Sequence, residues 1–588
     1  MQLQYPLEEK IGSPDLLVGR KKEFASFNKW IGRMPHKLSK SRVILARRKS
    51  GKTSFVQRIF NQVWSQNGTV VPFFLDIADE AIWYPEFARK YYSHFMSQYI
   101  SFLERDTSLV RNPLSLDDIR AYAKTNKDID FVVRDVERFW QHEERGQHYF
   151  MWEIASHAPH RYASLSGLDD RTTRRFLVIL DEFQNIATHV YRNQAFQGTP
   201  HKTMPGSFHS LSESKVAPML VTGSYPGILL EIMANYLEAG RLSIFRMKPS
   251  LEPKHGLEAV YRYAQFYHEP IKDETAEYIN ELCMSDPFLI SCVISNELEG
   301  KDLTKRNGVS KAVAYELSHF ESEMSKTWNE YLRRTFERTN GVTTKKLMLF
   351  LNKNSEQDYR PSDLKSELNL TLSEEEIYER LEVLMASDVI RQGQSAFRFR
   401  GLEDGTLNLI LRNHFEEEIE GVRPDFIGEF EAQLKAERAE TRKWRGLAND
   451  FKGRLAEIKL AFVFRSKQQM GQPLNLTDYF TDVADTRPLK LVSVMERVSH
   501  RLLNGDGEEI DIIAKADDGR VVMVEVRDRK DKTGTKPVMG LQTNALDYAE
   551  QYGVAVLPAF LSLSGFTEEA IEFCKANGIA IARENLTI

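Results

Sequence analysis

The sequence predicts an α/β protein of several domains, in which two α/β regions are separated by a helical middle. Short β-branched runs alternate with helical stretches in the first third of the chain, as an α/β sheet requires. Strands and helices alternate again from about residue 450 to residue 588. At roughly 100–200 residues per domain, the 588 residues imply about three to five domains.

The composition excludes several classes of protein. With 42% hydrophobic and 28% charged residues, the chain is neither disordered nor collagen-like nor a coiled-coil rod. Its longest apolar runs fall short of the roughly 18 residues that span a bilayer, and the N-terminus lacks the layout of a secretory signal. Three cysteines and no CxxC pair exclude a disulfide scaffold and a zinc ribbon. We therefore expect a cytoplasmic protein without membrane contact. With a net charge of −5, it can bind nucleic acid only through a local basic patch.

A phosphate-binding loop is the first functional motif. The expected strand Arg42–Leu45 runs into residues 46–53, ARRKSGKT, and Ser54–Val63 then reads as a helix. In this order the loop's N–H groups and the helix N-terminus converge on phosphates, Lys52 reaches the β and γ oxygens, and the Thr53 hydroxyl binds Mg²⁺. Ala46 stands where the motif usually has its first glycine. The expected nucleotide contacts from this segment are Arg48, Lys49, Ser50, Gly51, Lys52, Thr53 and Ser54.

Two later strands are expected to complete the nucleotide site, and Val70–Asp76 is predicted as a further buried strand. Asp181 and Glu182 follow the apolar run Phe176–Leu180, where the Asp can hold Mg²⁺ through water and the Glu can polarise the attacking water. The strand Met219–Thr222 leads to Ser224, a candidate sensor of the γ-phosphate. The alternative is that Asp181 and Glu182 only begin an exposed helix. The helical insert at 84–164 carries aromatic residues at helical spacing and is predicted to be a packed subdomain.

The middle of the chain is predicted to be a helical lid followed by a winged helix. The lid is expected at 251–335. Three helices and a hairpin follow it, at Thr343–Lys353, Pro361–Leu368, Ser373–Met385, and Val389–Gln392 with Ala396–Arg400. Ser373 and Glu376 form a capping-box pattern at the start of the third helix. Because that helix is acidic, we favour a structural or regulatory role over DNA reading.

Five short motifs resemble those of the archaeal-type ATPases, a branch of the STAND/AAA+ P-loop proteins. They are Val18–Glu23, Ala46–Thr53, Leu180–Gln184, Thr222–Ser224 and Gly240-Arg241. The resemblance covers roughly residues 15–410, with the ATPase core at 1–250 and the winged helix at 336–413. It implies that Gly19 and Arg20 lie near the adenine and that Arg241 lies near phosphate or a neighbouring subunit. The alternative for Arg241 is an ordinary surface arginine.

A charged linker helix is expected at 414–449. The charge changes there from acidic, in residues 415–431, to basic, in residues 435–454. Either the linker is a solvated helix, or it is a hinge whose basic end faces nucleic acid beside the last domain.

Three carboxylates in the last domain, residues 450–588, are predicted to form a metal site. Glu457 lies in a helical stretch, and Asp511 and Glu525 lie on adjoining strands of a hairpin. Glu525 and Arg527, two residues apart on one strand, point to the same face. Carboxylates that meet beside a cationic side chain can hold a divalent metal that activates water against a phosphodiester.

This arrangement resembles the PD-(D/E)XK nuclease fold, with Asp511 as its D and Glu525-Val526-Arg527 as its ExK. The resemblance implies that Gln542 and Tyr548 flank the site. Arg527 replaces the usual lysine and stays protonated, so it can position water or stabilise the developing charge without acting as a base; Lys530 could reach in instead. The alternatives are an inactive relative that only binds nucleic acid, and a chance arrangement on a half-buried sheet.

The sequence therefore predicts an ATP-controlled switch with a nuclease-like effector, a layout that resembles prokaryotic defence and mobile-element proteins. Its expected cofactors are ATP and Mg²⁺, and its expected partners are DNA, further copies of the chain and a trigger protein. The expected catalytic residues are Glu182, Asp511, Glu525 and Arg527. The expected metal ligands are Thr53, Asp181, Glu457, Asp511 and Glu525. The rival hypotheses are a non-cutting DNA-binding adaptor and a signalling scaffold that does not bind DNA.

Overall fold

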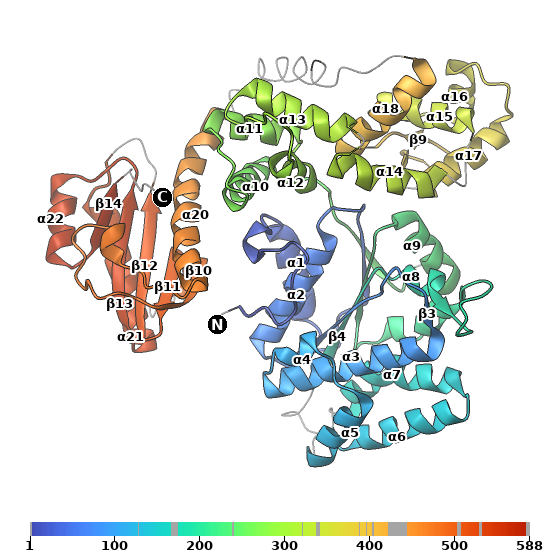
Figure 1. The fold of residues 1–588 in the computed structure, drawn as a ribbon, viewed down its shortest axis with the longest axis horizontal. Coiled ribbons are helices and arrows are strands. Elements are labelled where there is room, and N and C mark those ends of the chain that lie inside the picture. Colours follow the sequence, from blue (N-terminus) through green and yellow to red (C-terminus); the bar gives the residue numbers. More distant parts are fainter. Residues whose placement is uncertain are drawn as a thin grey trace. The chain divides into compact units, whose positions relative to one another are not determined.

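The chain divides into two units, Leu3–Phe430 and Glu431–Ile588, each with its own sheet (Figure 1). The computed structural model describes residues 3–126, 129–165, 174–237, 240–319, 321–336, 341–386, 389–395, 397–402, 405–421, 428, 444–502, 507–527 and 532–583. The finer domain boundaries expected at 250, 335, 413 and 449 stay predictions.

A parallel five-stranded sheet forms the centre of the first unit, in the order β2-β4-β6-β1-β7. Its strands are β1 (Arg42–Leu45), β2 (Val70–Asp76), β4 (Arg175–Asp181), β6 (Met219–Gly223) and β7 (Ser243–Arg246). The bounds predicted for β1 and β2 are confirmed, whereas β7 was not predicted; its residues are largely exposed and lack the buried apolar run that marks the others. Because all five strands run the same way, their carboxyl ends meet at one edge.

Helices cover both faces of this sheet. Helix α1 (Lys21–Ile31) and helix α2 (Lys52–Gln66) lie on one side, and the predicted insert lies on the other (Figure 1). The insert comprises α3 (Tyr84–Glu104), α4 (Ser108–Arg111), α5 (Leu116–Thr125), α6 (Phe131–Glu144) and α7 (His148–Leu165). The chain crosses the sheet in one direction between β1 and β2 and in the opposite direction between β2 and β4. Because such crossovers are right-handed, the helices of the two connections lie on opposite faces. The aromatic stripe of the insert is buried, since Tyr91 and Phe95 both pack edge-on against Phe73 of β2.

The helical middle of the chain is present in the predicted order. Its first five helices are α10 (Pro253–Phe266), α11 (Asp273–Leu282), α12 (Pro287–Ser295), α13 (Arg306–Ser318) and α14 (Glu323–Phe336), called the lid below. They are followed by α15 (Val342–Lys353), α16 (Pro361–Glu367), α17 (Glu374–Ala386), the hairpin of β8 (Arg391–Gln392) and β9 (Phe399–Arg400), and α18 (Gly405–Glu420). The capping box is confirmed, because Ser373 and Glu376 each bond the other's backbone N–H. The winged-helix identity stays a prediction, and most of the expected linker lies outside the described residues.

An N-terminal strap, residues Gln4–Lys10, runs along α2. Three buried polar side chains of α2, four residues apart and therefore on one helix face, bond its backbone. Ser65 accepts from the N–H of residue 4, and Gln57 accepts from that of Lys10. Asn61 bonds both polar groups of Leu7, accepting from its N–H at 3.0 Å and donating to its carbonyl at 2.9 Å.

The second unit is a mixed sheet in the order β10-β11-β12-β13-β14, covered by helices on both faces. Its strands are β10 (Leu491–Arg501), β11 (Gly507–Ala516), β12 (Arg520–Arg527), β13 (Ala555–Ser562) and β14 (Ala580–Arg583). The first three are antiparallel and the last three parallel. Helix α20 (Trp444–Gln469) packs on one face, and α21 (Thr535–Tyr552) and α22 (Glu568–Ala576) pack on the other.

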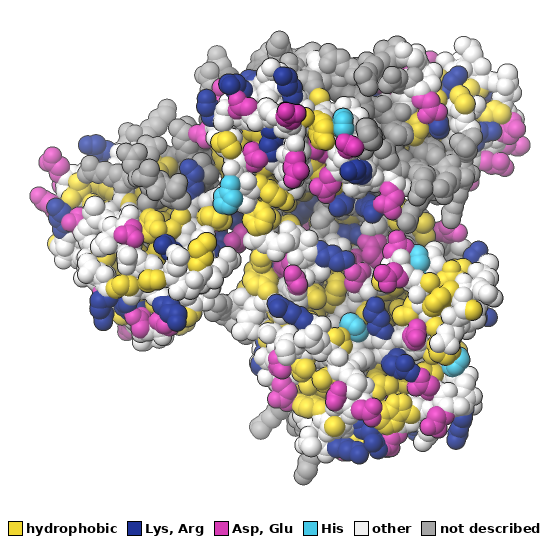
Figure 2. Space-filling model, viewed as in Figure 1, with side chains coloured by type: hydrophobic (Ala, Val, Ile, Leu, Met, Phe, Trp, Pro, Cys, Tyr) yellow, Lys and Arg dark blue, Asp and Glu magenta, His cyan; other side chains and the backbone are white. Residues whose placement is uncertain are grey.

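The surface carries charges of both signs. Acidic and basic side chains are interspersed over the visible face of both units (Figure 2), as the small net charge suggests. In the part of the chain that the structure describes, every helix is too short or too polar to cross a membrane.

The strap depends on Asn61, so we predict that Asn61→Leu destabilises the first unit. The substitution leaves a backbone donor and a backbone acceptor of Leu7 without their partner, which costs about 1–3 kcal/mol. Denaturant unfolding of the full chain measures the loss. Leucine at the exposed Gln66 of the same helix is the control, and equal stability of the two variants would contradict the role given to Asn61.

Candidate functional site

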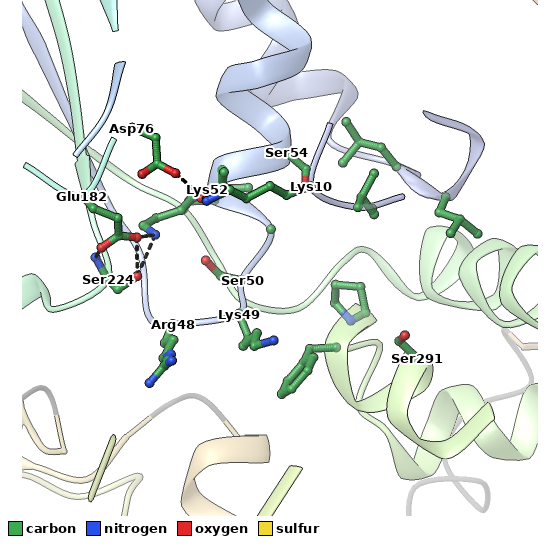
Figure 3. A pocket seen from close by; sticks show the side chains of 18 of the residues that line it. Lys10, Arg48, Lys49, Ser50, Lys52, Ser54, Asp76, Glu182, Ser224 and Ser291 are labelled. Atoms are coloured by element: carbon green, nitrogen blue, oxygen red, sulfur yellow. Dashed lines mark hydrogen bonds and ion pairs between the residues drawn. The ribbon is translucent and has the colours of Figure 1, made fainter. Parts of the chain in front are cut away.

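Several of the predicted nucleotide-site residues meet at the carboxyl edge of the parallel sheet. The loop after β1, Glu182 after β4 and Ser224 after β6 all line a cavity of about 710 Å³ (Figure 3). Apolar and aromatic residues from the segment before α1 and from the lid line other parts of it. The cavity thus has a polar wall of loop and strand ends and less polar walls elsewhere.

Lys52 joins the ends of β4 and β6. Its ammonium Nζ lies 2.5 Å from Glu182 Oε1 and donates to Ser224 Oγ at 2.8 Å (Figure 3). The Ser224 N–H donates to the other Glu182 oxygen at 3.0 Å. Burial alone would raise the pKa of Glu182, but the Lys52 ammonium and the hydrogen bonds outweigh it and lower that pKa to about 2. Glu182 is therefore ionised at neutral pH, as a group that polarises water must be.

Asp181 and Thr53 form the corner predicted for magnesium. Thr53 Oγ1 donates to Asp181 Oδ2 at 2.7 Å, and the Thr222 hydroxyl donates to Oδ1. Asp181 is completely buried, and this burial raises its pKa, with a further contribution from Glu182. A hydroxyl beside a carboxylate is the oxygen donor set that Mg²⁺ takes in P-loop sites. These residues fit the ion.

Unusual backbone conformations build this site. Gly51, the residue before α2, has φ +81°, and Lys49 has φ +63°, so the loop turns sharply into the helix. Glu182 itself has φ +54°, a strained value for a residue other than glycine and typical of functional positions. Gln184 donates to Glu182 Oε2 at 2.6 Å, and a Cβ at Gly223 would lie 2.3 Å from the Gln184 side chain. A larger residue at 223 would therefore displace the Gln184 side chain from this position.

Gly19 and Arg20 lie beside the phosphate-binding loop. Gly19 has φ +69°, and a Cβ there would lie 3.0 Å from His255 of the lid. The Arg20 guanidinium is buried and donates to the carbonyls of Ser50, at 3.4 Å, and of Pro249, at 3.1 Å. It therefore connects the loop to the segment that leads into the lid. Their expected position near adenine stays a prediction.

The charged side chains of the loop contact the lid. Arg48 Nη1 lies 3.1 Å from Glu330 Oε2, and Lys49 Nζ lies 3.8 Å from Glu323 Oε1, both on α14. Arg48 and Lys49 also line the cavity. The sequence did not predict their contacts with the lid.

Arg47, for which no role was predicted, makes a buried contact between the loop and the lid. It forms a buried ion pair with Asp286, the residue before α12. Its guanidinium carbon Cζ lies over the Trp328 ring, 5.1 Å from the ring centroid. Asp286 Oδ1 also accepts from the N–H of Phe288 and so caps α12. One carboxylate therefore holds both the loop and a lid helix.

Arg241 lies elsewhere, outside the cavity lining. Its Nη1 lies 3.0 Å from Glu213 Oε1 and 3.4 Å from the carbonyl oxygen of His209. The structure places it with these partners and not beside the loop.

The carboxylates of the second unit lie where two strands separate. The ladder between β11 and β12 ends at the pair Ile512 and Val524, just before Asp511 and Glu525. Beyond it, Asp511 Oδ2 accepts from the Val526 N–H at 2.7 Å, so a side chain takes the place of a backbone acceptor. Asp511 is thereby fixed against the strand that carries Glu525 and Arg527.

Arg497 of β10, which sequence analysis missed, approaches Glu457 of α20. Its Nε lies 3.4 Å from Glu457 Oε2 and 3.7 Å from Glu509 Oε1. It has φ +48° and, like Asp511 opposite it, forms no ladder pair. Its neighbour Glu496 also contacts α20, although consecutive residues of a regular strand point to opposite faces.

The predicted metal set is not assembled within the described residues. No group of three or more His, Cys, Asp or Glu side chains there has the arrangement to hold a metal ion. Glu457 is buried and contacts Arg497. The metal-ligand role given to Glu457, Asp511 and Glu525 stays a prediction.

The flanking residues on α21 have other contacts. Gln542 donates to Asn577 at 2.6 Å, and the Tyr548 ring lies 5.2 Å from that of His500. His500 in turn bonds Asp547 at 2.9 Å. Lys530, the other residue considered for the site, lies outside the described residues.

Comparison with known proteins supports the two-part organisation. Residues 494–586 match the family model Mrr_cat, described as a restriction endonuclease. This match includes Asp511, Glu525 and Arg527 but not Glu457. None of the curated proteins matches the chain significantly.

Solved structures resemble the remainder of the chain. The Walker-type ATPase PABY2304 of Pyrococcus abyssi is 16% identical, with 69% of this chain and 99% of that chain covered and a TM-score of 0.42. The ORC2 protein of Aeropyrum pernix in its ADP form is 13% identical, with coverages of 70% and 97% and a TM-score of 0.36. The RuvB Holliday junction branch migration motor of Thermotoga maritima is 12% identical, with coverages of 68% and 96% and a TM-score of 0.27.

The strand order and the loop after β1 define the first unit as a P-loop ATPase fold, and the family match defines the second as a restriction-endonuclease-like domain. The predicted fold class and the predicted fusion of these two parts are confirmed.

Asp286 should stabilise the junction between the loop and the lid. Asp286→Asn keeps an oxygen that can cap α12 but leaves the buried Arg47 charge without its counterion, which costs about 3–5 kcal/mol. Denaturant unfolding measures the loss, and hydrogen exchange of α12 locates it. The exposed pair of Lys22 and Glu252 is the control, since Glu252→Gln should leave the stability almost unchanged. Equal losses in the two variants would contradict this role of Asp286.

Proposed function

We propose that the first unit binds ATP with Mg²⁺ and hydrolyses it. The observation that carries the proposal is the assembly of Lys52, Thr53, Asp181, Glu182 and Ser224 at one edge of the sheet. These residues come from three separate segments, and P-loop enzymes use residues of these types to hold phosphate, the metal ion and the attacking water.

In the proposed reaction each residue has one task. The loop N–H groups and Lys52 would hold the β and γ phosphates, and Thr53 with Asp181 would hold the magnesium ion, which would neutralise charge on the phosphate oxygens. Glu182 orients and polarises the attacking water. Phosphate oxygens replace Glu182 and Ser224 as the acceptors of Lys52, which frees the Glu182 carboxylate for the water.

The second unit is proposed to be a metal-dependent DNA nuclease that the ATPase controls. The match to a restriction endonuclease family and the fixed position of Asp511 beside the Glu525 strand support it. Asp511 and Glu525 would hold the metal ion, and Arg527 would stabilise charge on the phosphate. The resemblance to STAND and AAA+ proteins supports assembly into oligomers, control by a trigger protein, and a role in prokaryotic defence or mobile-element biology.

A second candidate is a non-cutting DNA-binding adaptor. Two observations favour it: arginine replaces the lysine of the nuclease motif, and Glu457 is engaged by Arg497. In this case nucleotide sets the conformation, and the second unit grips DNA through its cationic side chains.

For the ATPase, Glu182→Gln should bind ATP but turn it over at least about a hundredfold more slowly, because the amide cannot polarise water as a carboxylate does.

Lys52→Ala should lose tight ATP binding, because it removes the charge that faces the β and γ oxygens. Calorimetry measures binding, and phosphate release measures turnover. Unchanged affinity of Lys52→Ala would show that the nucleotide site is misplaced, and unchanged turnover of Glu182→Gln would make Glu182 a structural residue.

For the nuclease, Asp511→Asn should abolish metal-dependent nicking of plasmid DNA while ATP binding stays normal. Asparagine can still accept the Val526 N–H bond, so loss of activity reports the missing ligand charge and not a lost contact. Asp517→Asn, on the exposed turn of the same hairpin, is the matched control.

Arg527 separates the two candidates. Arg527→Lys should keep or raise nicking in an active nuclease. In an adaptor no variant nicks DNA, and Arg527→Ala weakens DNA binding and its salt dependence. Nicking that survives Asp511→Asn would overturn the nuclease assignment at this site.

A further inference from the structure

Lys10 reaches the nucleotide site from a part of the chain that no motif marks. It is the last residue of the strap, and its side chain lines the cavity with the loop and Glu182. Its ammonium lies 2.6 Å from Asp76 Oδ2, and Figure 3 marks this ion pair close to Lys52.

The strap fixes the backbone of Lys10. Its N–H donates to the buried Gln57 at 2.8 Å. The preceding Glu9 is buried, and its two oxygens accept from Nε and Nη2 of Arg58 at 2.7 and 2.8 Å. Arg58 also donates to the Pro14 carbonyl at 2.6 Å, so the chain is held on both sides of Lys10. In contrast, the Lys10 side chain is 59% exposed. A fixed backbone therefore presents a side chain that can change partners.

The strand order places Lys10 across the acidic pair from Lys52. Asp76 ends β2 and pairs in register with Asp181, which ends β4. Lys52 bonds Ser224 at the end of β6, on the other side of β4. Burial opposes the charge of Lys10, but Asp76, with contributions from Asp181 and Glu182, raises its pKa. The acids at the end of β4 are thus flanked by an ammonium group on either side.

We propose that Lys10 is a second lysine of the nucleotide site, held by the strap so that it contacts the terminal phosphate of a bound nucleoside triphosphate. The proposal rests on the nucleotide binding proposed above. A surface ion pair with Asp76 alone would contribute little, whereas a lysine whose backbone is held at a phosphate-binding cavity can reach the phosphate by a movement of its side chain alone. Lys10 moves from Asp76 to the phosphate, and it is a binding and positioning residue in this role.

The test compares ATP with ADP, because only ATP carries the terminal phosphate. Calorimetry with Mg²⁺ on the full chain should show that Lys10→Met binds ATP roughly tenfold or more weakly, the effect of losing a hydrogen bond to a charged group, with ADP affinity unchanged. Lys10→Arg should restore much of the loss. Lys22→Met, at an exposed lysine outside the cavity lining, is the control and should bind both nucleotides as the parent does. Thermal unfolding of Lys10→Met should match that of the parent.

The outcomes separate this proposal from the one on which it rests. Equal weakening of ATP and ADP, or no weakening of either, overturns the role of Lys10. If Lys52→Ala also leaves ATP binding unchanged, the nucleotide site itself is wrong. If Lys52→Ala loses binding while Lys10→Met does not, only the role of Lys10 fails. The strap variant Asn61→Leu should share the selective loss for ATP, since it loosens the segment that positions Lys10.

Discussion

The position of β6 between β1 and β4 is the constraint on which the nucleotide site depends. A parallel sheet brings the carboxyl ends of all its strands to one edge, so the loop after β1 and the acids after β4 face each other across one intervening strand. Lys52 spans that gap and meets Glu182, while Ser224 fills the end of β6 between them. The backbone of Glu182 is strained at this meeting point, with φ +54°.

The loop after β1 contacts both the sheet edge and the lid, and it therefore links the nucleotide site to the lid. Its backbone and Lys52 are directed toward the sheet edge, whereas the side chains of Arg47, Arg48 and Lys49 contact acids of the lid. A change in the loop conformation on nucleotide binding would therefore alter its ion pairs with the lid, above all the buried pair of Arg47 and Asp286.

The site of the second unit follows from an irregularity in its sheet. Regular strands point consecutive side chains to opposite faces of the sheet. Here β10 and β11 both lose their pairing at Arg497 and Asp511, and β11 leaves β12 at the same level. Arg497 thereby reaches Glu457, and Asp511 reaches the backbone of the next strand. Irregular strands of this kind are common next to active sites.

The amino-acid sequence alone predicts the elements whose signals are local. The apolar runs of β1 and β2, the loop Ala46–Thr53 and the acids after β4 were all predictable, because strand patterns and phosphate loops depend on neighbours along the chain. It also determined the two-part organisation. It could not give the exposed edge strand β7, which lacks an apolar pattern.

The charged groups that meet from distant parts of the chain are known only from the folded structure. Lys10 and Asp76 are 66 positions apart, and Arg47 and Asp286 are 239 apart, so no local pattern relates them. Their pairing depends on the strand order, on the polar face of α2 and on the packing of the lid. The contact between Arg497 and Glu457 likewise depends on the left-handed backbone of Arg497, which the residue type does not predict. Local propensity therefore fixed the parts, and long-range packing fixed which ionic groups face one another.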